Sequence, residues 1–325
     1  MATAFSNTDR LVALGTAEDD GTLWLVTYKE GQEYLTSLTP EGRLAGTYNL
    51  RRIPLRPMEW IGWLSLATSN HSTGLLASLT SGGQVQTFEG AFFVPVGRDG
   101  PGTPRRVAGQ GTQWPTLIAA GLGEFLAAGD QEPLTLLKLD SKGNVLWRRS
   151  FSRRLVLPEV AVGADRKILM ASQGGRYLQL QLLDDSGRAL ASGRIAARQG
   201  VVEPDSDGGW TLLVSKGWGG KDNKVYLTRL DSRLRQLSQV ETPLCGLHGL
   251  SYQLISTPHG HVMLGESPDG QQREIVAEYE RSGRLLWQQG ISVPFVPRLL
   301  TFSSGFYIVN VDFPGGGVDI EKYLF

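Results

Sequence analysis

The chain contains few side chains whose type and spacing could support chemistry, and the histidines are the first to consider. His259 and His261 form a His-x-His pattern beside the start of an apolar strand. Alternation along a strand points both rings to one side, and this spacing can hold a metal ion. Two histidines make an incomplete site, and no third ligand lies near them in the sequence. We therefore assign no metal.

A cysteine and a histidine also lie close together, at Cys245 and His248. Such a pair can form an activated nucleophile, but a lone cysteine is more often a small buried hydrophobic residue. No Gly-x-Ser-x-Gly motif and no paired carboxylates stand out. Glu159 and Glu203 are the carboxylates that an enzyme could direct inward, although they form no recognisable set. We assign no catalytic residue and no cofactor.

The loop at residues 216–224 is the most unusual segment, because it places Trp218 among three glycines. A tryptophan with so little local scaffold is suited to contact a protein partner or a sugar ring. We therefore predict that Trp218, Lys221, Asp222 and Asn223 contact a partner. The alternative is that Trp218 folds back over its own sheet.

Four arginines are expected on the same face as this loop, on adjacent structural repeats: Arg153, Arg154, Arg176 and Arg198. Together they would form a basic patch that accepts an acidic protein partner. The alternative is a set of scattered, solvated charges. We include these arginines in the predicted partner-binding surface.

The overall composition excludes several classes of protein. The 325 residues carry 32 basic and 32 acidic side chains, and this balance argues against a general binder of nucleic acid or anionic membranes. A single cysteine excludes an intramolecular disulfide framework and a cysteine-based zinc site. No apolar run of about 18 residues is present to span a membrane. The segment Met1–Arg10 lacks the apolar region of a signal peptide.

A sequence repeat shows how the chain is organised. An apolar strand, a short polar turn with glycine and a second strand recur, most clearly at Leu139–Trp147 and Tyr279–Trp287. The aligned turn positions are 42, 100, 143, 187, 234 and 283, with Leu234 in place of glycine. A second series of strands, each preceded by a tight turn, gives seven units. Period-2 alternation is widespread and helical periodicity is absent.

Units of about 45 residues with four short strands each predict an all-β fold, a single seven-bladed β-propeller with four-stranded antiparallel blades. The last unit lacks its fourth strand, and we expect Thr3–Ser6 to supply it, so that the N-terminal strand closes the last blade. One domain would then span residues 1–325. The expected blades cover residues 8–50, 51–110, 111–153, 154–199, 200–243, 244–292, and 293–325 together with 1–7.

The segment Leu137–Trp147 resembles the repeats of quinoprotein-like (PQQ-type) propellers, and only two copies retain the tryptophan. The resemblance implies the fold without the quinone site, because the calcium and the other ligands of that site cannot be placed here. It also implies an extracytoplasmic, periplasmic location, with any signal segment lying outside the given sequence.

These observations favour a non-catalytic protein-binding scaffold, monomeric on its own, that engages another protein through loops of one face. By analogy, it would be an envelope assembly factor or an inhibitor of a cognate protein. One alternative is an enzyme acting on a small molecule or glycan. A second alternative is a lectin, which would need an aromatic and polar pair repeated in every blade. Trp60, Trp114 and Trp218 do not recur at equivalent positions.

Overall fold

A computed structural model gives the structure of the chain. The residues that it describes are 10–29, 32–50, 53–55, 59–81, 87–110, 116–129, 134–151, 156–217, 223–245, 252–268, 273–292, 297–311 and 318–325. Within these ranges the regular structure consists of β-strands, and no helix is long and apolar enough to cross a membrane.

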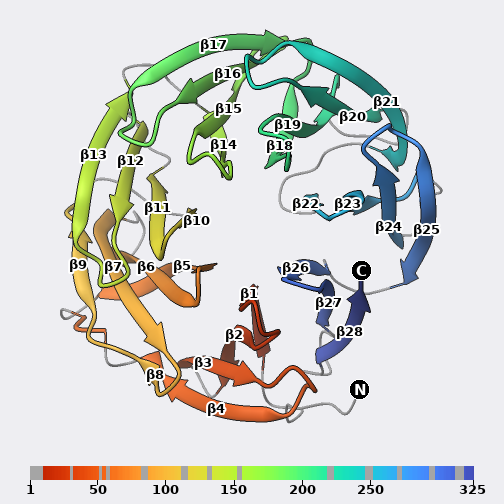
Figure 1. Ribbon diagram of the computed structural model, residues 1–325. Coiled ribbons are helices and arrows are strands. Elements are labelled where there is room, and N and C mark those ends of the chain that lie inside the picture. Colours follow the sequence, from red (N-terminus) through yellow and green to blue (C-terminus); the bar gives the residue numbers. More distant parts are fainter. Residues whose placement is uncertain are drawn as a thin grey trace. The chain divides into compact units, whose positions relative to one another are not determined.

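The described residues form 28 strands in seven antiparallel sheets, and neighbours in each sheet are mostly consecutive in the sequence (Figure 1). The first sheet contains β1 (Arg10–Ala17), β2 (Leu23–Lys29), β3 (Gln32–Leu38) and β4 (Leu44–Asn49). The second contains β5 (Glu59–Ser69), β6 (Ser72–Ser81), β7 (Thr87–Gly97), β8 (Gly100–Pro101) and β9 (Arg105–Ala108). The third contains β10 (Thr116–Gly121), β11 (Glu124–Gly129), β12 (Leu134–Leu139) and β13 (Val145–Phe151).

The fourth sheet contains β14 (Val156–Val162), β15 (Ile168–Gly174), β16 (Tyr177–Leu183) and β17 (Ala189–Ile195). The fifth contains β18 (Gln199–Pro204), β19 (Trp210–Ser215), β20 (Lys224–Leu230) and β21 (Gln236–Cys245). The sixth contains β22 (Gln253–Ser256), β23 (Gly260–Glu266), β24 (Arg273–Glu280) and β25 (Leu285–Ser292). The seventh contains β26 (Arg298–Phe302), β27 (Gly305–Val311) and β28 (Val318–Leu324). This succession confirms the predicted class, an all-β seven-bladed β-propeller.

The repeated turn has the conformation that its sequence predicts. In the third sheet, the Asp140 carboxylate accepts hydrogen bonds from the backbone N–H groups of Lys142 and Asn144, at 2.9 and 2.8 Å. The turn then passes through Gly143 at φ +79°, a left-handed conformation that glycine adopts at little cost. Leu234 adopts the same conformation at φ +65°. The aspartate of the repeat therefore accepts hydrogen bonds from the backbone of its own turn.

The chain divides into two compact units. One comprises Met1–Arg154, Leu300–Ser304 and Phe313–Ile320, and the other comprises Leu155–Leu299, Gly305–Asp312 and Glu321–Phe325. We call them unit 1 and unit 2. The organisation of residues 1–325 as a single domain remains a prediction.

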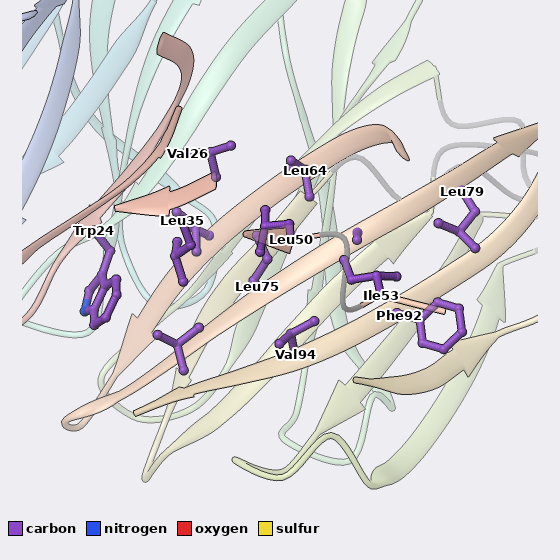
Figure 2. Packing of buried hydrophobic residues seen from close by; sticks show 13 residues of the cluster. Trp24, Val26, Leu35, Leu50, Ile53, Leu64, Leu75, Leu79, Phe92 and Val94 are labelled. Atoms are coloured by element: carbon purple, nitrogen blue, oxygen red, sulfur yellow. The ribbon is translucent and has the colours of Figure 1, made fainter. Parts of the chain in front are cut away.

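Each unit has apolar cores between neighbouring sheets. In unit 1, Figure 2 shows Trp24 and Leu35 of the first sheet, with Leu75 and Val94 of the second sheet, in one buried cluster. In unit 2, a comparable cluster joins the fourth and fifth sheets around Leu180 and Trp210. The fifth sheet also packs against the sixth, around Leu213 and Met263, so both of its faces are buried, as expected when sheets pack face to face.

The seventh sheet has three strands in the described part of the chain, whereas the first and the third to sixth sheets have four. The segment Thr3–Ser6, which we expect to supply a fourth strand, lies outside the described residues. In the second sheet, β8 and β9 both pair with β7. The copy of the repeat around Gly100 is therefore followed by an outer strand in two parts, β8 and β9.

Candidate functional site

Most of the predicted partner-binding residues lie outside the described ranges. These are Trp218, Lys221, Asp222, Arg153 and Arg154. The Asn223 side chain is described, and it organises the base of its own loop. Its Nδ2 donates to Ser215 Oγ at 2.6 Å, and its Oδ1 accepts from Gly217 N at 2.9 Å.

The remaining two predicted residues lie at separate connections of unit 2. Arg176 is exposed in the turn between β15 and β16, and Arg198 is half-buried between β17 and β18. The backbone N–H of Arg198 donates to the carbonyl oxygen of Ser215 at 2.8 Å. The basic surface therefore stays a prediction.

The predicted Cys–His pair lies partly outside the described residues, because His248 is not among them. Cys245 is buried at the end of β21, and its backbone carbonyl accepts a hydrogen bond from the Tyr252 hydroxyl. Burial raises the pKa of Tyr252, and the charge of Glu266 raises it further.

His259 and His261 have different surroundings. His259 is exposed in the turn before β23, whereas the His261 side chain is 2% exposed. The Nε2 atom of His261 lies 3.0 Å from Asp205 Oδ1. Among the described residues, no group of three or more histidine, cysteine or acidic side chains is placed to hold a metal ion.

Asp205 is the centre of a buried polar network in unit 2. Arg229 Nε donates to Asp205 Oδ2 at 2.8 Å, and Thr211 Oγ1 donates to the same oxygen at 3.1 Å. Burial by itself would raise the pKa of Asp205, but the hydrogen bonds and charges of His261 and Arg229 hold it well below its ordinary range. Asp205 is therefore ionised at neutral pH.

This network resembles a catalytic triad in its residue types only. Thr211 Oγ1 lies 3.1 Å from His261 Nε2, so the threonine and the aspartate meet the same ring nitrogen. A triad needs the nucleophile on one nitrogen and the carboxylate on the other. The Nδ1 atom of His261 is buried without a hydrogen-bond partner in the described structure. The geometry therefore cross-links the fifth and sixth sheets and does not activate a nucleophile.

Glu159 and Glu203, the carboxylates suited to an enzyme, lie on β14 and β18 of adjacent sheets in unit 2. Glu159 is exposed. Burial raises the pKa of Glu203 to about 8, opposed by a hydrogen bond from the Ser256 backbone and reinforced by the charge of Asp205. Glu203 can therefore exchange a proton near neutral pH.

A recess of about 300 Å³ lies in unit 2, among β24, β25, β27 and β28. We call it the aromatic recess. Its lining residues are His259, Glu278, Trp287, Gln289, Phe306, Tyr323, Leu324 and Phe325. Leu324 and Phe325 are 70% and 40% exposed. Sequence reasoning missed the recess, because its residues come from strands far apart in the sequence.

Aromatic stacking builds the floor of the recess. The rings of Phe306 and Tyr323 stack with centroids 4.9 Å apart, and Trp287 stacks with Tyr323 at 6.1 Å. Trp287 Nε1 donates to Glu278 Oε2 at 2.6 Å. Burial raises the pKa of Tyr323 to about 12, as does its hydrogen bond to Glu321. Trp287, one of the two tryptophans that the repeat retains, therefore lines the recess.

No protein-family model matches the chain, and no curated protein matches it. Solved structures do. The Cps50 (Swd1) β-propeller domain of Myceliophteria thermophila is 10% identical, with 99% of each chain covered and a TM-score of 0.62. Virginiamycin B lyase of Staphylococcus aureus, in a catalytically inactive form with quinupristin, is 9% identical, with 99% of this chain and 98% of that chain covered and a TM-score of 0.63.

BamB of Moraxella catarrhalis is 13% identical, with 100% of this chain and 92% of that chain covered and a TM-score of 0.50. These structural matches establish the fold. At such low sequence identity they say nothing about activity. The chain is a β-propeller protein by this likeness as well as by its sheets. Its relation to PQQ-type propellers remains a resemblance of repeats.

Proposed function

We propose that the protein is a non-catalytic β-propeller scaffold that binds another protein. The observation that carries this proposal is a row of exposed apolar side chains on the outer strands. They follow the repeated turn by two or three positions in five sheets, and each is between 40% and 57% exposed. These residues, which we call the outer-strand row, are Leu44, Val145, Leu146, Leu190, Leu237, Leu285 and Leu286.

A single exposed apolar side chain needs no explanation, but recurrence at the same two adjacent positions of the outer strand in five sheets points to a shared role. Strand alternation could place polar residues there at no cost to the fold, as it does for Ser192 of β17. Apolar side chains that desolvate on contact supply much of the energy of protein interfaces. Within each unit, these side chains are therefore suited to contact a protein partner.

The loop at residues 216–224 and the four arginines remain part of the proposed partner surface. Trp218 would serve as an aromatic anchor, and the arginines would select an acidic partner. The proposed roles are envelope assembly or inhibition of a cognate protein, in the periplasm, as a monomer before the partner binds. The support for this location is the resemblance to PQQ-type repeats.

The test is capture of partners from the native organism by the intact protein, followed by mass spectrometry. Three variants are compared: Leu190→Ser combined with Leu237→Ser, Trp218→Ala, and the control Leu122→Ser. Leu122 is 67% exposed but lies in a turn outside the row. A partner that binds the proposed surface is lost with the first or second variant and retained with the control. Equal recovery of every protein with all three variants contradicts the proposal.

An enzyme is the second candidate, and Glu203 is the observation that favours it. A carboxyl group with a pKa of about 8 can act as a general acid at neutral pH. The test is hydrolysis or elimination across a panel of glycosides and lactones by the wild-type protein and by Glu203→Gln. Turnover that disappears with Glu203→Gln supports an enzyme, and no turnover by the wild-type protein leaves the scaffold as the better proposal.

A further inference from the structure

The aromatic recess combines ring surfaces with negative charge. The Trp287 and Tyr323 rings are nearly parallel, at 11°, with centroids 6.1 Å apart. Since closely stacked planes lie nearer than this, the rings are offset and parts of their faces stay uncovered. The face of an aromatic ring carries the negative part of its quadrupole, which attracts a cation.

Glu278 adds a full negative charge to the recess. Its Oε2 is fixed by the indole N–H of Trp287, at 2.6 Å. This neutral donor orients the carboxylate but does not neutralise it. In the described part of the chain, no ion pair is recorded for Glu278. Its other oxygen, Oε1, can therefore accept a charged donor, and a half-buried carboxylate gains from an adjacent cation.

The cationic side chains nearest in sequence have other contacts. Arg284 forms an ion pair with Glu280, and Arg281 donates to the Pro258 carbonyl at 3.3 Å. Lys322 lies 5.7 Å from the centroid of the Tyr307 ring. A cation that binds in the recess would therefore not be one of these three side chains.

We propose that the aromatic recess binds an organic cation, a guanidinium or alkylammonium group on a short apolar stem. The head group would lie at Glu278 and the stem along the rings of Trp287 and Phe325. A volume of about 300 Å³ is at the small end of ligand sites and fits such a group. The cation is either a free small molecule or an arginine or lysine side chain of a protein. The inference stands apart from the outer-strand row.

Two isosteric probes test the proposal on the full chain. Butylguanidinium carries the charge, and butylurea has nearly the same shape without it. Binding is followed by the NMR signal of the Trp287 indole N–H, assigned with Trp287→Phe. Butylguanidinium should shift this signal and butylurea should not. Equal shifts with both probes, or none with either, would overturn the proposal.

The variants test the role of the carboxylate. Glu278→Gln keeps an oxygen for the indole N–H but removes the charge, so the affinity for butylguanidinium should fall about tenfold. Glu241→Gln, an exposed carboxylate on β21, is the control and should leave it unchanged. Gln289→Glu adds a charge at the recess and should tighten binding, even if Glu278→Gln fails to fold. Unchanged affinity with both recess variants would contradict the proposal.

A final comparison separates the two sources of the cation. The same titration is run with a blocked glycine–arginine–glycine tripeptide. Binding of the tripeptide as tight as that of butylguanidinium indicates a protein side chain. Binding of butylguanidinium alone indicates a free small cation.

Discussion

His261 Nε2 lies 3.0 Å from Asp205 Oδ1, and each side chain is 2% exposed. The two residues are on different sheets of unit 2, so this contact joins β23 to the turn after β18. Asp205 also pairs with Arg229, and removing one partner of such a buried pair leaves an uncompensated charge.

Replacing Asp205 should therefore destabilise the protein strongly. We expect Asp205→Asn to reduce the free energy of unfolding by about 3 kcal/mol at pH 7, because Arg229 and His261 lose a shared carboxylate. The pKa of Asp205 is lowered in the folded state, so its stabilising effect is present above about pH 4 and is lost as the pH falls further. Urea unfolding at pH 7 and pH 3 measures this. A difference between wild type and variant that does not shrink at pH 3 would contradict the assignment.

Glu203 should give the opposite dependence on pH. Its folded pKa of about 8 lies above the ordinary value, so the folded state binds its proton more tightly than the unfolded state. The resulting stability is present below about pH 4 and is lost as the pH rises through 8. Glu203→Gln should therefore raise the melting temperature at pH 9 relative to wild type, with a smaller gain or none at pH 5. Glu241→Gln is the exposed control, and matching profiles for both variants would refute the prediction.

Gly143 should be more sensitive than Gly175 to an added methyl group. A Cβ at this position would lie 2.7 Å from Phe93 Cδ1, and the φ of +79° adds a cost of about 1–2 kcal/mol for any L-residue. At Gly175, φ is +74° and a Cβ would have no neighbour within 4 Å. Thermal unfolding should show a larger loss for Gly143→Ala than for Gly175→Ala. Equal losses would mean that Phe93 moves aside freely.

Deletion of the first seven residues should destabilise the whole protein. The seventh sheet has three strands in the described part of the chain, and Thr3–Ser6 is the segment that we expect to complete it. Thermal unfolding of the shortened chain measures the effect. A melting temperature equal to that of the full chain would show that this segment does not close the sheet.

The turns and strands could be predicted because their causes are local. Alternation defines the strands, and the aspartate in the turn satisfies backbone N–H groups two and four residues later, as Asp184 does for Ser186 and Arg188. Even Leu234 could be aligned with the turn glycines before its φ was known. Such signals need no knowledge of distant residues.

The buried network and the aromatic recess could not be predicted, because they depend on contacts between separate repeats. His261 occupies a strand position at which other sheets have Leu23, Phe125, Ile168 and Trp210. A histidine among these apolar residues was a signal that the position had a polar partner. The identity of that partner, Asp205, is apparent only from the packing of two sheets.

The order of strands within the sheets has a consequence for how the protein is made. In the first and the third to sixth sheets, each strand pairs with the strand that precedes or follows it in the chain. The hydrogen-bonded contacts are therefore short in sequence, and low contact order favours rapid folding. Each of these sheets can be completed as soon as about 45 residues have left the ribosome. Few unpaired strand edges are therefore exposed during translation. If synthesis pauses between two sheets, the strands already made can all be paired.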